Sequence, residues 1–365
     1  MSFARGAMNS PYMEWAKLRS EAKLNLASSG LQSFPLTELP VKLEDLEING
    51  PTIYGYAPLQ ERLAKKNGVP TENVVAATGT SMANHLAMAA MVEPGDEVLI
   101  EEPTYELLLS ALRYLGAHVK TFPRCFENGW AVDPNDVKKT LSSRTRLIVL
   151  TNLHNPTSAL IPEETLGEIG RLTAKTGAKV LVDEVYLEAM FEAPQRSAFH
   201  LGEQFVITSS LTKAYGLSGL RCGWILAEKK LAQRMWRLND LFAATPAHPA
   251  ELLSVIALDH LDRVKARAKK ILDANRKALR SLIEPRPEIE MTPPDYGTTV
   301  FPRLRRGNVE QFCRILREKY EISIVPGHFF DAPQHFRIGI GGDPEMTATG
   351  LERLAAALAE FSKNS

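Results

Sequence analysis

The sequence predicts an α/β protein in which a mostly parallel sheet, covered by helices, is followed by a smaller α+β unit. From about residue 58 to 240, helix-period segments alternate with short β-branched runs, which is the pattern of βαβ units. Several runs, such as LIVL at 147–150 and KVLVD at 179–183, are apolar without alternation, as strands covered on both faces are. After Leu241 the rhythm changes, and this change predicts the second unit.

The first unit contains a regular succession of expected elements. Its helices are expected at Pro58–Asn67, Ser81–Met91, Tyr105–Leu115, Pro134–Leu141, Pro162–Thr176 and Glu228–Leu241. Its strands are expected at Val74–Ala77, Glu97–Glu101, His118–Phe122, Arg146–Leu150, Lys179–Val182, Phe205–Thr208 and Gly223–Ala227. These seven runs are enough for a seven-stranded sheet.

The remaining segments are less regular. A charged amphipathic stretch from about Ala250 to Leu282 is followed by Pro-rich turns, a shorter mixed segment and a final helix at Pro344–Ser362. The first 50 residues are punctuated by prolines and are expected to be irregular. We therefore expect an N-terminal segment that packs on the small unit (1–50), a large unit (51–245) and a small C-terminal unit (246–365).

Composition and charge exclude several classes of protein. With 365 residues, the chain is too long for a small disulfide-stapled module. Its 44% hydrophobic and 24% charged residues are typical of an ordinary globular protein. Lys plus Arg total 43 and Asp plus Glu total 43, so the formal net charge is zero and polyanion binding is disfavoured. We expect no nucleic-acid partner.

The cysteines and the N-terminus indicate the cellular compartment of the protein. Three widely spaced cysteines, Cys125, Cys222 and Cys313, argue against a disulfide framework and against a CxxC metal or redox site. The histidines also lack metal-ligand spacing, so no metal site is expected. The N-terminus lacks the apolar core of a signal peptide, and no stretch approaches the roughly 18 apolar residues that span a bilayer. We expect a cytoplasmic protein with no membrane partner.

The most informative segment is SSLTKAYGLSGLRCGW, in which one lysine stands among small, hydroxylic and glycine residues. Lys213 has no obvious carboxylate neighbour, and Arg221 follows eight residues later. A nearby cation and partial desolvation would lower the pKa of the amine, which makes it a usable nucleophile. Ser210 and the glycines would let hydroxyls and backbone amides approach an anion. A loop lysine in solvent is the alternative for this segment taken alone.

Three further motifs lie where strands meet loops. ATGTSM runs from a strand into a helix, so Thr80 and Ser81 could bind a phosphate or simply cap the helix. NLHNPT and VLVDEVY follow buried runs, at the carboxyl ends of strands where open α/β sheets place their ligands. Taken alone, Asn155 could be a turn residue before proline and Asp183 a strand-end cap.

Together, these motifs resemble the fold type I pyridoxal-phosphate (PLP) enzymes, and specifically the class I/II aminotransferases. The resemblance is carried by SSLTKAYGLSGLRCGW, NLHNPT, VLVDEVY, TGTSMANHLA, EEPTYE and FRIGIGG, which extend from about residue 50 to 342. It implies a large domain with a mostly parallel seven-stranded sheet, a smaller α+β domain and a PLP molecule bound between them. It also implies a homodimer that moves an amino group from an L-amino acid to a 2-oxo acid.

The resemblance implies a role for each residue that matches the family pattern. Lys213 forms the Schiff base with the cofactor and moves protons. Asp183 pairs with the pyridine nitrogen, which lets the ring accept the charge of the substrate carbanion. Asn155 and Tyr186 hydrogen-bond the phenolic oxygen of the ring, and Tyr105 stacks on the ring face.

The resemblance also implies contacts to the phosphate and to the substrate. The implied phosphate site consists of Gly79, Thr80, Ser81, Ser210 and Arg221. Arg337 would bind the α-carboxylate of the substrate in a bidentate way. Gly30, in the segment Ser28-Ser-Gly30, would line the substrate entrance, and Asn155 would also contact the substrate.

The sequence departs from the family pattern near its start. Gly50 stands where members commonly place a tyrosine that reaches the phosphate of the neighbouring subunit, and Tyr54 or Tyr56 could substitute for it. We find no second arginine for a side-chain carboxylate, so a dicarboxylate substrate is not supported.

Two alternatives to transamination remain. The same residues serve PLP-dependent decarboxylases, β-eliminating lyases and cyclases, because the motifs specify the cofactor better than the fate of the carbanion. A non-catalytic ligand-sensing module that keeps the cofactor pocket is disfavoured, since no DNA-binding extension is expected in this chain.

Overall fold

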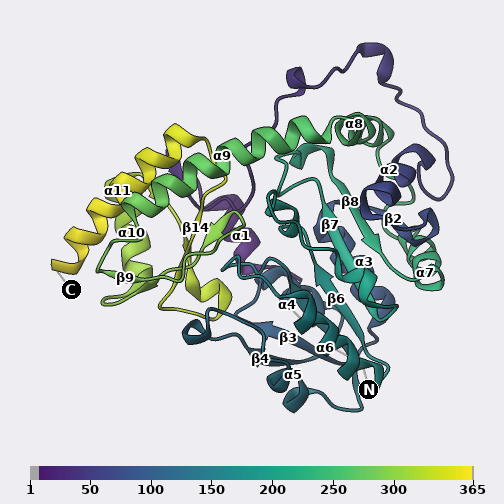
Figure 1. Ribbon diagram of the computed structural model, residues 1–365, viewed down its shortest axis with the longest axis horizontal. Helices are drawn as coiled ribbons and strands as arrows, with labels where there is room; N and C mark the ends of the chain where they lie inside the picture. Colours follow the sequence, from purple (N-terminus) through teal and green to yellow (C-terminus); the bar gives the residue numbers. More distant parts are fainter. Residues whose placement is uncertain (1–7, 364–365) are drawn as a thin grey trace.

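A seven-stranded sheet forms the centre of the larger unit in the computed structural model, which describes residues 8–363 (Figure 1). Its strands are β2 (Val74–Thr78), β3 (Glu97–Glu102), β4 (His118–Pro123), β5 (Thr145–Thr151), β6 (Lys179–Asp183), β7 (Phe205–Ser210) and β8 (Cys222–Leu226). Their order across the sheet is β2-β8-β7-β6-β5-β3-β4. β8 runs antiparallel to both of its neighbours, and the other neighbouring pairs are parallel. The predicted mostly parallel, seven-stranded sheet is confirmed.

Both faces of this sheet are buried. In β5, Leu147 and Val149 join one hydrophobic core, whereas Ile148 and Leu150 join the other. Because successive side chains of a strand point to opposite faces, a strand between two cores is an unbroken apolar run. The helices of this unit are α2 (Ala57–Asn67), α3 (Gly79–Met91), α4 (Glu106–Tyr114), α5 (Pro134–Thr140), α6 (Glu163–Ala174) and α7 (Lys229–Asn239).

The smaller unit combines short strands with long helices. The strands are β1 (Leu24–Asn25), β9 (Ile289–Glu290), β10 (Thr299–Val300), β11 (Arg303–Leu304), β12 (Ile322–Ser323), β13 (Val325–Pro326) and β14 (Phe336–Gly339). They form a three-stranded sheet, β10-β14-β13, and the pairs β11-β9 and β1-β12. The helices are α8 (His248–Asp259), α9 (Leu261–Leu282), α10 (Val309–Tyr320) and α11 (Pro344–Lys363). Helices α9 and α11 pack side by side (Figure 1).

The amphipathic stretch expected from Ala250 to Leu282 is two helices, not one. The chain leaves helical geometry at His260 (φ −114°, ψ 24°), between α8 and α9. Helix α8 packs against α2 and β8 of the larger unit, while α9 packs against α11. Because of this break, one amphipathic stretch packs against the larger unit through α8 and against the smaller unit through α9.

Two helices, α1 (Pro11–Leu18) and α10, were not predicted from the sequence. Pro11 occupies the first turn of α1, where a helix needs no N–H donor, and Ser10 caps that turn by accepting from the Met13 N–H (3.2 Å). A proline interpreted as a break is thus the start of a helix. Helix α10 begins in the same way, because the Asn308 side chain accepts from the Gln311 N–H (2.9 Å).

The segment before α2 touches both units. The Leu26 N–H donates to the Ser323 carbonyl (2.9 Å), and the Leu26 carbonyl accepts from the Gly339 N–H (2.7 Å), both in the smaller unit. The Leu31 N–H donates to the Lys213 carbonyl (2.9 Å) in the larger unit. The division of the chain at residues 50 and 245 stays a prediction.

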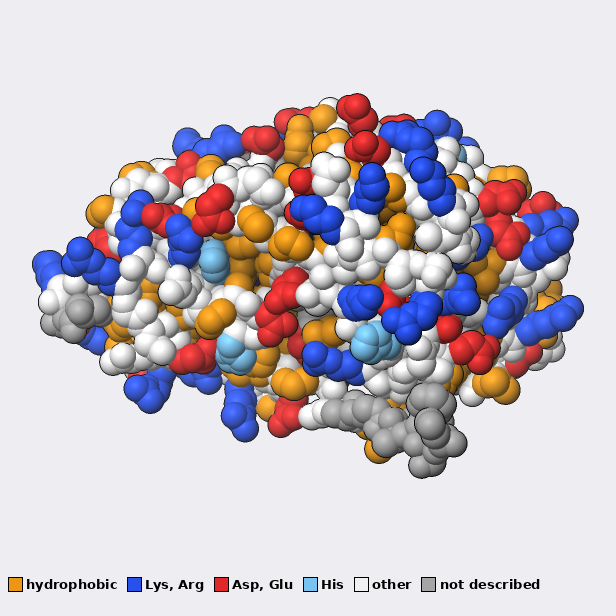
Figure 2. Space-filling model, turned by 90° about the horizontal axis from the view of Figure 1, so that it is seen from below, with side chains coloured by type: hydrophobic (Ala, Val, Ile, Leu, Met, Phe, Trp, Pro, Cys, Tyr) orange, Lys and Arg blue, Asp and Glu red, His pale blue; other side chains and the backbone are white. Residues whose placement is uncertain are grey.

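Charged side chains of both signs are mixed on the surface. Figure 2 shows Lys and Arg interspersed with Asp and Glu on one face of the molecule. Within residues 8–363, none of the helices combines the length and the apolar character that crossing a bilayer requires.

Candidate functional site

A cavity of about 840 Å³ lies at the carboxyl ends of β5 and β6, where the start of α3 and helix α1 also contribute to the wall. Most of the residues predicted from the sequence line it, namely Thr80, Ser81, Tyr105, Asn155, Asp183, Tyr186, Lys213 and Arg221. The other four, Gly30, Gly79, Ser210 and Arg337, are not part of this lining but contact residues that are. The structure therefore brings the predicted site residues together.

Lys213 follows β7 and extends into the cavity towards a neutral partner. Its Nζ donates a hydrogen bond to Ser29 Oγ (3.0 Å), which also accepts from the Tyr186 hydroxyl (2.7 Å). Burial lowers the pKa of Lys213, and the positive charges of Arg337 and Arg221 act in the same direction. The amine therefore loses its proton more easily than an exposed lysine does.

Asp183 is the last residue of β6 and is only 4% exposed. Its Oδ2 accepts from Asn84 Nδ2 (2.8 Å), and its Oδ1 accepts from the Val185 N–H (3.1 Å). Asn84 is fixed in turn by the Thr208 hydroxyl, which donates to Asn84 Oδ1 (2.5 Å). Burial raises the pKa of Asp183 to about 6, although these hydrogen bonds to the carboxylate oppose the rise. The site thus holds a buried carboxylate that a cationic ligand would stabilise.

The start of α3 forms a candidate anion site. Gly79 has a φ of +75°, and a Cβ at this position would collide with the Arg221 guanidinium. The Thr80 hydroxyl donates to Ser210 Oγ (2.7 Å). Among the described residues, the two Nη atoms of Arg221 donate only to the backbone carbonyls of Ser218 and Thr78, each at 3.4 Å. A helix N-terminus, hydroxyls and a weakly engaged arginine together suit a phosphate.

Arg337, in β14, is fully buried, with 0% of its surface exposed. Its Nη1 donates to Asn155 Oδ1 (2.9 Å), and its Nη2 donates to the Tyr12 hydroxyl (2.8 Å) and the Ala27 carbonyl (2.9 Å). In the described chain, its Nε has no hydrogen-bond partner. The hydrogen-bond partners are all neutral, so an anion that reached this guanidinium would gain charge-assisted hydrogen bonds.

Tyr105 and Gly30 border the cavity from different segments. The Tyr105 ring meets the Tyr12 ring edge-on, with 5.6 Å between the ring centroids. A Cβ on Gly30 would lie 3.4 Å from Lys213 Cδ, so the glycine leaves space beside the lysine side chain. Tyr54 and Tyr56 do not line the cavity.

Asn84 and Tyr12 are site residues that were not predicted from the sequence. Asn84 lies three residues after Ser81 in TGTSMANHLA, on the same face of α3, so helical spacing could have identified it. Tyr12 belongs to the unpredicted helix α1, and its partner Arg337 is 325 residues away. No local sequence pattern predicts the contact between Tyr12 and Arg337.

The groups around the cavity fit PLP. The Lys213 amine suits an aldehyde, the Asp183 carboxylate suits a protonated ring nitrogen, and the α3 N-terminus with Arg221 suits a phosphate. The buried Thr212 hydroxyl also lacks a hydrogen-bond partner among residues 8–363, although Thr212 lines the cavity. Such a group is expected to bond to a ligand or to water.

Comparison with known proteins gives concordant matches. A sequence profile described as aminotransferase class I and II matches residues 36–354. Capreomycidine synthase from Streptomyces vinaceus is 30% identical over 366 residues, which cover 96% of this chain and 92% of that protein. The crystal structure of a PLP-dependent aminotransferase from Streptococcus suis 89-1591 aligns with a TM-score of 0.91 at 27% identity and covers 99% of both chains. The crystal structure of the PLP-dependent cyclase OrfR aligns with a TM-score of 0.88 at 26% identity, over 99% of this chain and 100% of that one.

These matches differ in whether they cover the first 35 residues of the chain. The profile begins at residue 36, so helix α1 and the segment with Ser29 lie outside it. Both crystal structures cover 99% of the chain, so their similarity includes this segment. Helix α1 supplies one wall of the cavity. The two crystal structures therefore resemble this chain over helix α1 as well.

Without cofactor, we expect Asp183→Asn to stabilise the protein at neutral and alkaline pH. The pKa of about 6 in the folded state lies above the ordinary 3.8, so the stability that depends on this group falls as the pH rises from about 4 to about 6. A shift of about two units corresponds to at most about 3 kcal/mol. Urea unfolding of the apoprotein and the variant should show the gain at about pH 8 and lose it at about pH 4. A gain that does not change over this range would contradict the expectation.

Proposed function

Because the chain belongs to the aminotransferase class I and II family, whose cofactor is pyridoxal 5′-phosphate, we propose that it moves the amino group of an L-amino acid to a 2-oxo acid. One observation carries this proposal: the Lys213 amine, the buried Asp183 carboxylate and Arg221 line one cavity, Arg337 stands directly behind its lining residue Asn155, and the hydrogen-bond partners of all four in the described chain are neutral. Each of these charges has a counterpart in the cofactor or in an amino acid.

Lys213 and Asp183 are the proposed catalytic residues, with Tyr186 beside them. Bound PLP supplies an electron sink for the carbanion that forms at the α-carbon of the amino acid. Asp183 would keep a proton on the ring nitrogen, because a cation beside it stabilises its buried carboxylate. Lys213 would bind the aldehyde carbon of the cofactor and later move the α-proton, and its lowered pKa favours the neutral amine that this task needs.

The remaining ring contacts follow from the hydrogen bonds already present. Arg337 occupies Asn155 Oδ1, which leaves Asn155 Nδ2 as a donor for the phenolic oxygen of the ring. Burial raises the pKa of Tyr186, so its hydroxyl keeps its proton, which would turn from Ser29 Oγ to the same ring oxygen when the cofactor binds. Tyr105 would stack on the ring face. We assign the phosphate to Gly79, Thr80, Ser81, Ser210 and Arg221.

Arg337 is the proposed anchor for the α-carboxylate of the substrate. It belongs to the smaller unit, whereas Lys213 belongs to the larger one. An amino acid held by Arg337 would therefore be oriented between the two units, with its α-carbon towards Lys213 and with Gly30 at its entrance.

A second candidate function is cyclisation or elimination on the same cofactor. It is favoured by the similarity to capreomycidine synthase and to the cyclase OrfR, which extends over almost the whole chain. Both kinds of reaction need the same removal of a proton from the α-carbon, so Lys213 and Asp183 would serve either one. They differ in where the nitrogen ends up: transamination leaves it on the cofactor, cyclisation keeps it in the product, and β-elimination releases it as ammonia.

Counting products separates the two functions. The holoenzyme is incubated with each of the common amino acids in the absence of any 2-oxo acid. A transaminase stops after one 2-oxo acid per active site, because the cofactor keeps the nitrogen, and it resumes when an acceptor is added. Many turnovers without acceptor would instead establish the second function: a cyclase forms no 2-oxo acid, whereas a β-eliminating lyase forms a 2-oxo acid and ammonia in equal amounts.

For Arg337→Lys, we expect a KM for the amino acid that is about 10-fold to 100-fold higher, because lysine keeps the charge but loses the planar fork of donors. The absorption spectrum of the bound cofactor should not change. The control substrate is the amine that lacks the carboxylate. Equal slowing of the amino acid and of this amine would show that Arg337 does not bind the carboxylate.

We also propose a cytoplasmic homodimer. The three cysteines are free, as a reducing compartment allows. Large apolar side chains are exposed on one surface, where Tyr54 donates to Asp240 (2.8 Å) and so joins the segment of Ile53 to that of Leu241. Ile53 is 62% exposed and Leu241 is 78% exposed. Exposed apolar surface of this kind marks an interface.

Sedimentation equilibrium tests the dimer. We expect twice the chain mass of 40.4 kDa for the wild type, and a shift towards the single-chain mass for Leu241→Glu, because a buried charge without a partner weakens an interface. A wild-type protein that is fully active at the single-chain mass would disprove the dimer.

A further inference from the structure

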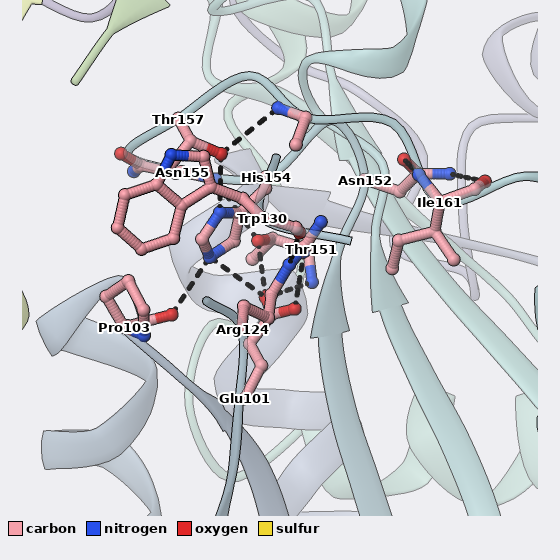
Figure 3. Close-up of polar contacts among 11 residues, drawn as sticks. Glu101, Pro103, Arg124, Trp130, Thr151, Asn152, His154, Asn155, Thr157 and Ile161 are labelled. Atoms are coloured by element: carbon pink, nitrogen blue, oxygen red, sulfur yellow. Dashed lines mark hydrogen bonds and ion pairs between the residues drawn. The ribbon is translucent and has the colours of Figure 1, made fainter. Parts of the chain in front are cut away.

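A buried ion pair that is not part of the cavity lining stands next to the site (Figure 3). Glu101, in β3, and Arg124, just after β4, lie 2.8 Å apart (Oε2 to Nη1), with their side chains 1% and 0% exposed. Burial raises the pKa of Glu101, and the guanidinium together with hydrogen bonds from Thr151 opposes this rise. Neither residue has a role in the function proposed above.

The second oxygen of Glu101 fixes Thr151, which does line the cavity. Glu101 Oε1 accepts from both the N–H (2.7 Å) and the hydroxyl (2.6 Å) of Thr151. The same hydroxyl oxygen accepts from the Asn155 N–H (3.2 Å). Because the single hydroxyl proton is directed to Glu101, the lone pairs of the oxygen are left for Asn155. Glu101 thereby orients the hydroxyl that anchors Asn155.

His154 joins this segment to the one that carries Tyr105. Its Nδ1 accepts from the Thr157 hydroxyl (2.7 Å), and its Nε2 donates to the Pro103 carbonyl (2.9 Å). A carbonyl can only accept, so Nε2 carries the ring proton. Burial lowers the pKa of His154 well below its ordinary value, which keeps the ring neutral. The hydrogen bonds of His154 therefore connect the loop that carries Asn155 to the loop that carries Tyr105.

Arg124 extends the network towards the smaller unit. Its Nε donates to the Trp130 carbonyl (2.6 Å). Trp130 has a φ of +65°, a conformation that a bulky residue rarely adopts. The Trp130 ring lies 5.8 Å from the Phe301 ring and 5.2 Å from the His335 ring, measured between centroids, and both of these belong to the smaller unit. His335 stands two residues before Arg337.

We propose that Glu101 and Arg124 are positioning residues, which hold Asn155 in place for the cofactor ring and for Arg337. This inference rests on the proposed function, because the placement of Asn155 matters to the reaction only if the cofactor and the amino acid bind there. Stability alone explains the pair poorly, since buried ion pairs are often no more stabilising than apolar residues of similar volume. In this chain, Glu101 directs its other oxygen to Thr151, which lines the cavity. Arg124 Nε donates to the carbonyl of Trp130, whose ring packs against the smaller unit near Arg337.

The same strand offers a matched control at its other end. Glu97 is 3% exposed and accepts from the hydroxyls of Ser142 (2.6 Å) and Thr145 (2.7 Å). It also pairs with Lys120 (2.7 Å). None of these four residues is among those that line the cavity. Glu97→Gln therefore alters a buried carboxylate of β3 without touching the site.

The test measures how apoprotein binds 4-deoxypyridoxine 5′-phosphate, which lacks the aldehyde and needs no bond to Lys213. For Glu101→Gln, we expect the dissociation constant from calorimetry to rise about tenfold over that of the wild type, equivalent to about 1.4 kcal/mol. Amide hydrogen exchange at Asn155 should become faster in this variant. For Glu97→Gln, we expect an affinity within about twofold of the wild type and unchanged exchange at Asn155, even if the melting temperature falls.

Thr151→Val keeps the ion pair and removes only the linking hydroxyl. We expect the same loss of affinity as for Glu101→Gln, so this variant decides the matter if Glu101→Gln does not fold. Affinities for Thr151→Val and Glu101→Gln equal to that of Glu97→Gln would overturn the positioning role. Failure of the wild type itself to bind the analogue would instead refute the cofactor assignment.

Discussion

Burial of charged groups without a hydrogen-bonded counter-ion is the constraint on which the site depends. Asp183 and Arg337 are buried and Lys213 is partly buried, yet the hydrogen bonds that they make within the described chain go to neutral groups. A protein tolerates such groups only when apolar burial elsewhere supplies the stability. The two hydrophobic cores on either face of the large sheet supply it here. A ligand that brings the opposite charges would be attracted more strongly beside these buried groups than in bulk water.

The parallel sheet explains why these groups meet. Thr151 and Asp183 are paired in register at the ends of β5 and β6, and Glu101 lies near the end of β3 on the other side of β5. Carboxyl ends of parallel strands share one edge of a sheet, so polar residues placed there converge. Arg337 reaches the same place from the smaller unit. Asn155 joins the two, because Thr151 holds its backbone while Arg337 holds its side chain.

The ends of the buried strands could be predicted from the sequence, because each strand is an unbroken apolar run and the first polar residue after it marks its end, as Asp183 does. The residues that complete the site could not be predicted in this way. Tyr12 meets Arg337 only because helix α1 packs against the smaller unit, far along the chain. Glu101 begins the motif EEPTYE, but nothing in that motif points to Arg124, and their pairing depends on the register of β3 and β4. Local patterns encode elements and their ends, whereas partners across the fold depend on packing.

The central claim is that Lys213 is the amine that receives the cofactor. The most direct measurement is to incubate the protein with PLP, reduce it with borohydride and map the modified peptide by mass spectrometry. We predict one pyridoxyl group per chain, on Lys213, because its easily deprotonated amine lines the cavity and is the better nucleophile. A pyridoxyl group found mainly on another lysine, with Lys213 unmodified, would contradict the claim.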